Sequence, residues 1–425
     1  MKRALFITLG CRLNHADTAL LVTRLKNAGY APVDGDEPSP DLIVLNSCAI
    51  TAEAEKKSRQ QIRRLRRDFP GAEIAVAGCA AELDPEKMFD CGADFVWSNP
   101  DKKNVFRQCS GQKSNTLNAD SFSENVFAEF PFRTRAFIKI QEGCDNHCSY
   151  CIVPTVRGPS RSRKFSECIA DCRHAVESGF PEIVLTGVNT CNYCDDGKKL
   201  PDLIREIAAL PGDFRIRLSS TEPHPDDLTL PHLIADPANK LCRFLHLSMQ
   251  HGSDRILKAM YRRYTAEQFM DFVDFVRKIV PDIHIGTDFI IGFPGENEHD
   301  FAEMLNVAEQ VAFANIHAFI YSPRPGTPAA ELPDRIAPEV AKQRMQQLRR
   351  IAEINSREFA LSQLGRETPV IFERAHGGML HGWSDNYLAV SVPEGTYPQG
   401  KIILLKADEK NLAENLQSVV SGDML

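Results

Sequence analysis

The chain has 425 residues and a net charge of −7, with 43% hydrophobic and 25% charged residues. This length suggests roughly two or three domains, and this composition excludes disordered and fibrous proteins. No apolar run approaches the ~20 residues that a membrane span needs, and the apolar stretch in MKRALFITLG is too short for a signal peptide. We therefore expect a cytoplasmic protein without a membrane partner. In that compartment, 13 cysteines indicate metal or cluster ligands more than disulfides.

Buried-strand and helix patterns alternate along the N-terminal quarter of the chain. The expected elements, in order, are a strand at 4–9, a helix at 17–28, a strand at 41–46, a helix at 51–67 and a strand at 73–77. Because parallel strands need crossover helices between them, this order predicts a parallel α/β sheet domain, to which we assign residues 1–115. A stretch rich in Ser and Asn at 110–123 predicts a linker.

A longer alternation follows the linker. Strand patterns occur at 136–140, 182–186, 214–218, 243–247, 283–290 and 315–320, and helical ones at 166–178, 201–210, 266–279, 299–311 and 338–361. This order predicts a partial parallel (β/α)6 barrel over residues 130–360, with its site at the C-terminal ends of the strands. Short β-like runs with Gly-rich turns then predict a small antiparallel β-barrel or sandwich at 363–425. The fold class is therefore α/β, in a multidomain chain.

Three cysteines gather in the segment EGCDNHCSYC, in the loop after the first expected barrel strand. They are Cys144, Cys148 and Cys151. Three thiolates on an irregular loop can hold a [4Fe–4S] cluster and leave one iron open to bind something else. A zinc site completed by His147, or by the pair Cys191 and Cys194, is the alternative. The spacing thus predicts a metal or cluster site at the mouth of the barrel.

Three further cysteines each follow the end of an N-terminal strand. They are Cys11, Cys48 and Cys79. Because parallel strands deliver their C-terminal ends to one edge of a sheet, these thiols can converge on a second cluster. Each alone would be a small buried hydrophobic residue, as free cysteine usually is. Cys168 and Cys172, four residues apart on an expected helix, are predicted to be core.

The loop resembles the radical S-adenosylmethionine (SAM) superfamily, whose pattern is C-x3-C-x-aromatic-C, with Tyr150 as the aromatic residue. The resemblance implies that the open iron binds SAM, and that an electron from the cluster cleaves SAM to a 5′-deoxyadenosyl radical. The whole chain resembles the methylthiotransferase family, which has a domain with a three-cysteine auxiliary cluster, a radical SAM core and a TRAM domain. The motifs that carry this resemblance include TLGCRLNHADT, LNSCAIT, AGCAA, EGCDNHCSYCIVPTVRGPSRSR, LSSTEP, MQHGSDRILKAMYRRYT, GTDFIIGFPGE and YSPRPGTPAA.

The resemblance implies two [4Fe–4S] clusters and SAM as cofactors, with the six cysteines above as ligands and catalytic residues. Residues expected to contact SAM lie mostly at strand ends: Tyr150, Gly187, Asn189, Ser219, Ser220, Glu222 and Gly292. In the family, the region of Gly187 and Asn189 meets the methionine part, and the serines and Glu222 could bind ribose hydroxyls. The alternative for Gly187 and Gly292 is an ordinary turn.

Two motifs bear on the substrate. LGCRLNHADT and TGVN resemble the family members that modify threonylcarbamoyladenosine beside the tRNA anticodon. The alternatives are isopentenyladenosine in tRNA and an aspartate of a small-subunit ribosomal protein. An iron–sulfur electron carrier or a non-catalytic RNA-binding protein is the hypothesis from a different class. It does not explain why both cysteine sets lack a fourth ligand.

The resemblance implies the tRNA anticodon stem-loop and an electron donor such as a flavodoxin or ferredoxin as partners, whereas the sulfur donor is unknown. Cations crowd the segments Lys56–Arg67 and Arg157–Lys164, which we expect to flank the RNA site; the alternative is solvated helix faces. Trp383 and Tyr387 are either stacking platforms for bases or core of the C-terminal barrel.

Overall fold

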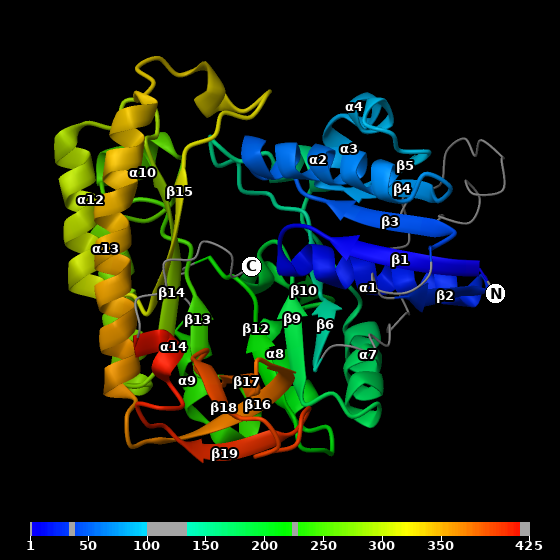
Figure 1. Cartoon of the computed structure of the whole chain (residues 1–425). Helices are drawn as coiled ribbons and strands as arrows, with labels where there is room; N and C mark the ends of the chain where they lie inside the picture. Colours follow the sequence, from blue (N-terminus) through cyan, green and yellow to red (C-terminus); the bar gives the residue numbers. More distant parts are fainter. Residues whose placement is uncertain (1, 34–38, 100–133, 223–227, 417–425) are drawn as a thin grey trace.

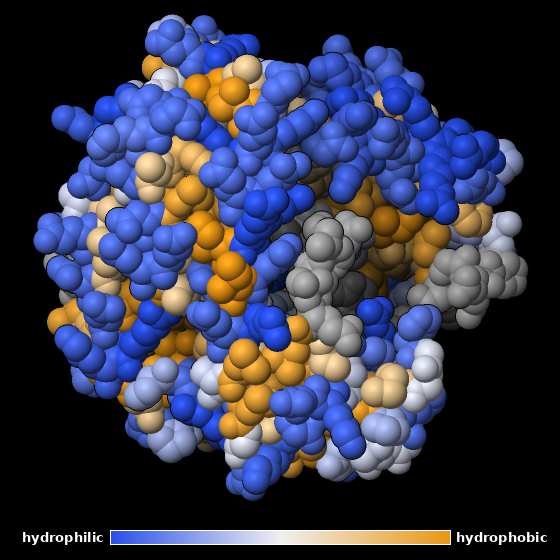
Figure 2. Space-filling view, turned by 60° about the vertical axis from the view of Figure 1, so that its left-hand side comes forward, coloured by the Kyte–Doolittle hydropathy of each residue, from blue (hydrophilic) through white to orange (hydrophobic). Residues whose placement is uncertain are grey.

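A computed structural model describes residues 2–33, 39–99, 134–222 and 228–416 (Figure 1). The expected linker at 110–123 lies outside these ranges. Within them, no helix combines the length and apolarity needed to cross a membrane. Hydrophilic residues cover most of the face in Figure 2, with apolar residues gathered in smaller patches.

The N-terminal part is a parallel sheet. In the described residues it has five strands in the order β2-β1-β3-β4-β5. They are β1 (Lys2–Thr8), β2 (Tyr30–Val33), β3 (Leu42–Ser47), β4 (Glu73–Gly78) and β5 (Phe95–Trp97). The structure confirms the three strands expected here and adds β2 and β5. Their sequence signal is weak because β5 has three residues and β2 is a half-buried edge strand that contains Pro32.

Four helices accompany this sheet in the described residues: α1 (Arg12–Asn27), α2 (Ala52–Asp68), α3 (Cys79–Leu83) and α4 (Pro85–Asp90). α2 begins where expected, because the Thr51 hydroxyl accepts a hydrogen bond from the Ala54 amide at 3.1 Å. α1 begins five residues earlier than the expected 17–28, which places Cys11 at its N-terminus.

The central part is also parallel and runs in chain order. One sheet has the order β12-β9-β6 and another the order β13-β14-β15, and a parallel bridge between Thr221 and Leu247 joins them. The strands are β6 (Arg135–Lys139), β9 (Glu182–Thr186), β12 (Arg215–Leu218), β13 (Phe244–His246), β14 (His284–Ile291) and β15 (Asn315–Ile320). The strands expected from the sequence are therefore all present.

Helices follow most of these strands. The helices are α6 (Val153–Arg157), α7 (Phe165–Glu177), α8 (Leu200–Ala208), α9 (Thr229–Ala235), α10 (Asp254–Ala259), α11 (Ala266–Ile279), α12 (Glu298–Val311) and α13 (Pro338–Ser362). Of these, α7, α12 and α13 are seen on the outside of the strands in Figure 1. Two short hairpins are β7 (Gln141–Glu142) with β8 (Arg161–Ser162), and β10 (Cys194–Asp195) with β11 (Lys198–Lys199). Short 3-10 turns lie at Thr190–Asn192, Pro237–Asn239 and Pro328–Glu331.

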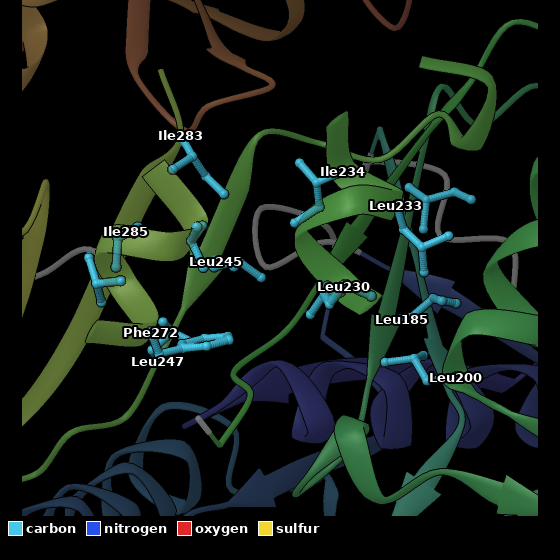
Figure 3. Close-up of a cluster of buried hydrophobic side chains, with 14 of the residues drawn as sticks. Leu185, Leu200, Leu230, Leu233, Ile234, Leu245, Leu247, Phe272, Ile283 and Ile285 are labelled. Atoms are coloured by element: carbon cyan, nitrogen blue, oxygen red, sulfur yellow. The ribbon is translucent and has the colours of Figure 1, made fainter. Parts of the chain in front are cut away.

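The main core lies between the central strands and these helices. Leu245, Leu247 and Ile285 of the strand region pack with Phe272 of α11 in one part of this core (Figure 3). Side chains of a strand alternate between its two faces, so the neighbours of these core residues point to the opposite, inner face. His246 and Asp288 are therefore on the inner face of the central sheet. Cys168 and Cys172 of α7 are buried in the same core, as expected.

The C-terminal part is an antiparallel sheet with the order β18-β17-β16-β19 in the described residues. Its strands are β16 (Glu367–His376), β17 (Met379–Ser384), β18 (Ala389–Pro393) and β19 (Ile402–Lys406), and α14 (Ala413–Leu416) follows. The sheet has a core of its own that includes Val370, Phe372 and Val390.

This sheet is docked on the N-terminal ends of the central strands through buried arginines. Arg217 donates to the Ser384 and Asp385 carbonyls at 3.0 Å each, and Arg215 donates to the Trp383 carbonyl at 3.0 Å. Although burial alone would raise it, the neighbouring guanidinium groups hold the pKa of Glu182 well below its usual range. An anionic Glu182 therefore balances the arginines at this junction.

Trp383 and Tyr387 take part in this junction. Their rings stack with centroids 4.9 Å apart, and Tyr387 also lies 4.9 Å from the Phe244 ring of β13. The Arg12 guanidinium is 5.3 Å from the centroid of the Tyr387 ring. The expectation of stacking platforms for bases is therefore wrong for Tyr387, whose ring is occupied by protein groups. The alternative, core packing, is correct for Tyr387, but its ring packs between the C-terminal sheet and β13 of the central part and not inside the C-terminal sheet.

Candidate functional site

The structure brings Cys11, Cys48 and Cys79 together; we call them the auxiliary triad. They follow β1, β3 and β4, which are neighbours in the parallel sheet. A Cβ added at Gly10 would lie 2.8 Å from the Cys48 Sγ, so only glycine permits this approach of the Cys11 backbone to Cys48. Burial, and the proximity of Cys79 and Cys11, raise the pKa of Cys48 to about 12.

Polar side chains fix the loops that carry the auxiliary triad. The Asn14 amide group donates to the Leu9 carbonyl at 2.7 Å and to the Ser47 carbonyl at 3.0 Å. The Ser58 hydroxyl of α2 accepts from the Cys48 amide at 3.2 Å. The three thiols are therefore held on defined backbones although they are far apart in sequence.

Cys144, Cys148 and Cys151 form a second group, the SAM triad, on the loop between β7 and α6. The Cys151 amide donates to the Cys148 carbonyl at 3.0 Å, and the Asn146 amide lies 3.4 Å from the Cys144 Sγ. Burial and the neighbouring thiols raise the pKa of Cys151 to about 12. With its pKa raised in this way, Cys151 becomes a thiolate only beside a positive centre, which a bound cluster supplies.

The zinc alternative for the cysteines is disfavoured by geometry. Thiolates on one tetrahedral zinc ion lie about 3.8 Å apart, because each Zn–S bond is about 2.3 Å. Among the described residues, the group close enough to share a single ion is His246, Asp288 and His317, and neither cysteine triad forms such a group. The same holds for Cys191 and Cys194, of which Cys194 is exposed. A larger cluster suits the wider spacing of the two triads.

Glu222, Asn189 and Arg262 connect the SAM triad to the strand ends. The Asn189 amide group donates to Glu222 at 3.0 Å, and Arg262 forms an ion pair with Glu222 at 3.1 Å. Asn146, between Cys144 and Cys148, also donates to Glu222. Arg262 Nη1 lies 3.4 Å from the Cys148 Sγ. The predicted residues Asn189 and Glu222 are thus beside the SAM triad.

The sequence analysis does not identify Arg262 and Asn146 as residues of this site. Their segments, MYRRYT and CDNHC, were recognised, but nothing local shows that these two side chains meet Glu222. The sequence separation is 114 residues between Arg262 and Cys148, and 76 residues between Asn146 and Glu222.

Buried polar atoms near this site lack a partner within the described residues. They are Thr186 Oγ1, Asn189 Oδ1 and Ser219 Oγ, at the C-terminal ends of β9 and β12. An unpaired buried polar atom costs about 1–3 kcal/mol, so these atoms suit a polar ligand. Together with the three thiols, they fit a cluster with SAM, whose amino, carboxylate and hydroxyl groups need such partners.

The other residues expected to contact SAM are Gly187, Ser220, Tyr150 and Gly292, and their surroundings are less informative about a ligand. Gly187 packs against Gln141, whose Oε1 would lie 2.9 Å from an added Cβ. Ser220 is exposed, whereas Ser219 is buried. Tyr150 lies against a small cluster that contains Phe293, and the adjacent Gly292 has a φ of 73° and would place a Cβ 3.3 Å from Ala341. Protein packing alone thus accounts for the glycines at 187 and 292.

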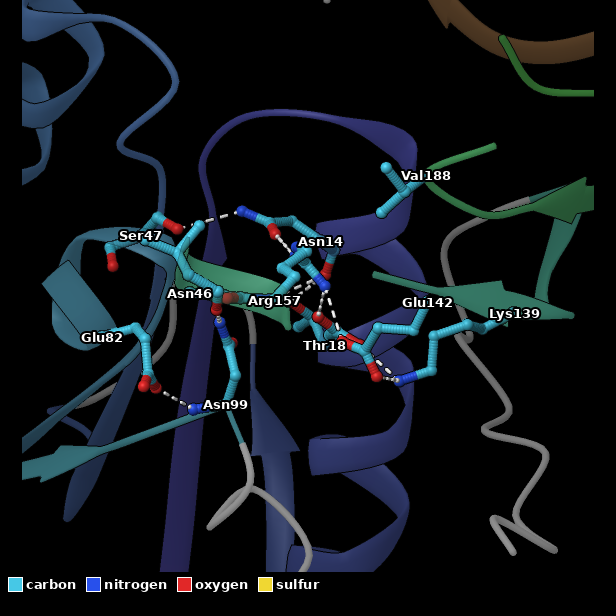
Figure 4. Close-up of polar contacts among 12 residues, drawn as sticks. Asn14, Thr18, Asn46, Ser47, Glu82, Asn99, Lys139, Glu142, Arg157 and Val188 are labelled. Carbon is cyan, nitrogen blue, oxygen red and sulfur yellow. Dashed lines mark hydrogen bonds and ion pairs between the residues drawn. The ribbon is translucent and has the colours of Figure 1, made fainter. Parts of the chain in front are cut away.

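A buried charge network joins helix α1 to Lys139, Glu142 and Arg157, which flank the loop of the SAM triad (Figure 4). Arg157, six residues after Cys151, donates to Asn14 Oδ1 at 2.5 Å, to Asp17 Oδ2 at 3.1 Å and to Glu142 Oε1 at 3.0 Å. Lys139 Nζ lies 2.9 Å from Asp17 Oδ1. Although burial alone would lower it, nearby Cys79, Asp17 and Glu142 raise the pKa of Arg157 well above its ordinary value. Helix α1 of the first sheet is therefore fixed to the loop of the SAM triad.

This network corrects one sequence expectation. Arg157 and Arg163 were expected to face RNA phosphates, but both are buried, and Arg163 forms an ion pair with Asp171 at 2.8 Å. In that segment, Arg161 and Lys164 are exposed. Helix α2 keeps five exposed cations, Lys56, Lys57, Arg63, Arg64 and Arg67.

Comparisons with known proteins agree with this geometry. The family model of the radical SAM superfamily matches residues 138–308, and that of the uncharacterized protein family UPF0004 matches residues 3–97. A solved structure of the radical SAM methyltransferase TsrM from Kitasatospora setae, with a tryptophan substrate and a SAM analog, has a TM-score of 0.57 at 16% identity. It covers 81% of this chain and 76% of that one. Fold, cysteine loop and family match together define a radical SAM enzyme.

Relatives similar over nearly the full length narrow this class. A threonylcarbamoyladenosine tRNA methylthiotransferase of Bacillus subtilis is 36% identical, over 96% of this chain and 94% of the relative. A tRNA-2-methylthio-N(6)-dimethylallyladenosine synthase of Cereibacter sphaeroides is 37% identical, over 95% of each. The chain belongs to the tRNA methylthiotransferases of the radical SAM superfamily. Its cofactors are [4Fe–4S] clusters and SAM.

Proposed function

We propose that this enzyme adds a methylthio group to C2 of N6-threonylcarbamoyladenosine, next to the anticodon of tRNA. The observation that carries the proposal is the connection of the two cysteine triads through Arg157, Asn14 and Asp17. Each triad has three thiols and no fourth ligand in its motif, so each would leave one iron of a [4Fe–4S] cluster open. Two such sites joined by one buried network suit a reaction that needs two reactive centres.

The chemistry of the substrate requires this arrangement. The hydrogen at C2 of adenine is bound to an sp² carbon and is not acidic, so no side-chain base with an ordinary pKa removes it. When bound, the cluster of the SAM triad together with SAM supplies a carbon radical that abstracts such a hydrogen. No side chain carries a transferable methylthio group, so the sulfur is assigned to the auxiliary triad, and its donor is unknown.

The residues of this chain position the reactants. Asn189, Ser219 and Glu222 are proposed to hold SAM at the ends of β9 and β12, where their polar atoms gather. Arg262 is proposed to place a positive charge beside Cys148, where it would attract the SAM carboxylate. Arg157 is proposed to hold α1, which begins directly after Cys11, against the segment that follows Cys151. An electron donor such as a flavodoxin or ferredoxin would complete the system.

We assign domains in keeping with this function. Residues 1–115 form the domain of the auxiliary triad, residues 130–360 the radical SAM core, and residues 363–425 a TRAM-like domain. The chain-order parallel strands of the core support a partial (β/α)6 barrel, and the antiparallel sheet β16–β19 supports a TRAM-like barrel. Because the substrate is tRNA, we expect the reaction to take place in the cytoplasm.

The proposed anticodon stem-loop interface includes helix α2. Its exposed Arg63, Arg64 and Arg67 lie on the same element that holds Cys48 through Ser58. Cations tracking the phosphates would let an unstacked loop base turn inward to the site. Asp68 pairs with both Arg64 and Arg67, so their side chains lie close together on the surface.

The choice of modified adenosine rests on motifs. One of the relatives above is named for threonylcarbamoyladenosine and the other for dimethylallyladenosine. Their sequence identities to this chain are almost equal, so identity does not decide between the two substrates. LGCRLNHADT and TGVN favour threonylcarbamoyladenosine, and dimethylallyladenosine is the second candidate.

Mass spectrometry of tRNA nucleosides from a deletion strain tests the choice. We expect loss of the 2-methylthio form of threonylcarbamoyladenosine, with the unmethylthiolated base accumulating, and restoration by the wild-type gene. A gene whose three SAM-triad cysteines are replaced by Ala is the matched control and should not restore it. Loss of the dimethylallyl product alone would instead establish the second candidate.

A further inference from the structure

A second group of potential ligands lies on the inner face of the central sheet. His246, Asp288 and His317 come from the neighbouring strands β13, β14 and β15, and Asp288 is directly opposite His317 in the β14–β15 pairing. His246 Nε2 lies 3.0 Å from Asp288 Oδ2, and His317 Nδ1 lies 3.3 Å from Asp288 Oδ1. The ligand atoms of the three side chains all lie within 4.8 Å of one another.

Neighbouring groups hold the three side chains in position. The Ser248 hydroxyl donates to Asp288 Oδ2 at 2.7 Å, and the Asn315 amide lies 3.3 Å from His317 Nε2. The two imidazole rings stack at 5.1 Å. Partners of this kind on the second nitrogen of a histidine, and on the ligand carboxylate, are typical of metal sites because they fix the orientation of the ligands.

The side chains are partly buried yet accessible from the interior. The exposed fraction is 7% for the His246 side chain, 22% for Asp288 and 28% for His317. An ion bound to all three would thus be shielded from bulk water on the strand side and open on the other.

The ligand types of this group indicate which metal ions it would bind. Two histidines and one carboxylate bind divalent first-row transition metals and leave further coordination positions open. Neighbouring ligand atoms in octahedral coordination at about 2.1 Å lie about 3.0 Å apart, close to the two His–Asp distances here. We propose that His246, Asp288 and His317 bind one divalent transition-metal ion, separate from the two cysteine triads.

The proposed site is linked to the SAM triad through the backbone. The Ser248 carbonyl accepts a hydrogen bond from Arg262 Nη2 at 3.1 Å, and Nη1 of the same Arg262 lies 3.4 Å from the Cys148 Sγ. The ion is therefore placed on the wall next to the SAM triad. The proposal concerns ion binding and holds whichever nucleotide the enzyme modifies.

Equilibrium dialysis of the reconstituted enzyme against Co²⁺ tests the proposal. Both clusters are loaded first, so that the triad thiols are occupied, and iron and cobalt are counted in the same sample. We expect one cobalt per chain in the wild type, with at least tenfold weaker binding in Asp288→Asn and His317→Ala at unchanged iron. His299→Ala is the matched control, because His299 is an exposed histidine that pairs only with Glu303 among the described contacts, and it should bind cobalt as the wild type does.

X-ray absorption at the cobalt edge identifies the ligands. Nitrogen and oxygen neighbours without sulfur are expected. Sulfur neighbours would place the ion on a cysteine and overturn the assignment. Equal cobalt uptake by the wild type, Asp288→Asn and His317→Ala, or no uptake by the wild type, would show that the three side chains form only a hydrogen-bonded group.

Discussion

Replacing Arg157 with Gln should loosen the attachment of helix α1 to the loop of the SAM triad. Arg157 and Lys139 are buried cations that pair with the buried carboxylates Asp17 and Glu142, and the partly exposed Arg161 also pairs with Glu142. The Arg157 side chain is only 2% exposed, and it donates a hydrogen bond to Asn14 Oδ1 at 2.5 Å. Without the guanidinium group of Arg157, Asp17 and Glu142 keep the Lys139 ammonium group as their buried cation, and Glu142 keeps the exposed Arg161.

The expected cost follows from burial. Removing one partner of a buried ion pair costs about 3–5 kcal/mol, because the other charge remains desolvated. Opening of α1 should therefore become roughly a hundredfold to a few thousandfold more frequent. Arg161→Gln is a matched control, since Arg161 pairs with the same Glu142 at 3.7 Å but is 41% exposed. An exposed pair contributes about 0–1 kcal/mol.

Hydrogen exchange of the α1 amides measures this opening. Under anaerobic conditions and with equal iron content, α1 should exchange much faster in Arg157→Gln than in the wild type, whereas exchange in α11 stays unchanged. Arg161→Gln should differ from the wild type by no more than about fivefold. If Arg157→Gln exchanged as slowly as Arg161→Gln, the network would not attach α1, and the reasoning on the two triads would lose its basis.

Two further predictions concern charge. Replacing Arg63, Arg64 and Arg67 of α2 with Glu should weaken tRNA binding and flatten its salt dependence, because fewer counterions are released from the phosphates. Filter binding across a salt series measures both the affinity and its slope with salt. An unchanged slope would show that these arginines face solvent and do not contact tRNA. The second concerns pH. Burial, with Arg217 and His246 nearby, lowers the pKa of His284 to about 3. The unfolded chain then binds the extra proton first, so this group should cost about 2 kcal/mol of stability between pH 6.5 and 5 and nothing above. Urea unfolding of wild type and His284→Leu at both pH values checks this, and an equal loss in both would exclude His284 as the cause.

Much of the architecture is readable from local sequence patterns. The apolar runs that form β3, β4 and the central strands are strong signals because these strands are buried. The glycines and cysteines that follow several of these runs mark the strand ends. The start of α1 was placed too late, because Arg12, Asn14 and His15 give no apolar periodicity. These polar residues are needed there for contacts with other parts of the chain.

Some features of the candidate site are likewise readable from local sequence, whereas others depend on distant residues. The cysteine triads are predictable because each auxiliary thiol follows a strand, and because the SAM-triad thiols are closely spaced in one loop. The burial of Arg157 is not, since Asp17 and Asn14 lie 140 and 143 residues away in the sequence. A run of cations looks the same whether it faces solvent, phosphates or buried carboxylates. For Tyr387, the deciding partner Phe244 likewise belongs to a distant strand.

The central claim is that the two triads have separate roles in one reaction. The most direct test replaces Cys11, Cys48 and Cys79 by Ala and measures two products in one anaerobic assay with SAM, reductant and tRNA. We predict that this variant still forms 5′-deoxyadenosine but no methylthiolated adenosine, whereas replacement of Cys144, Cys148 and Cys151 abolishes both. Methylthiolated tRNA at the wild-type level from the first variant would contradict the account.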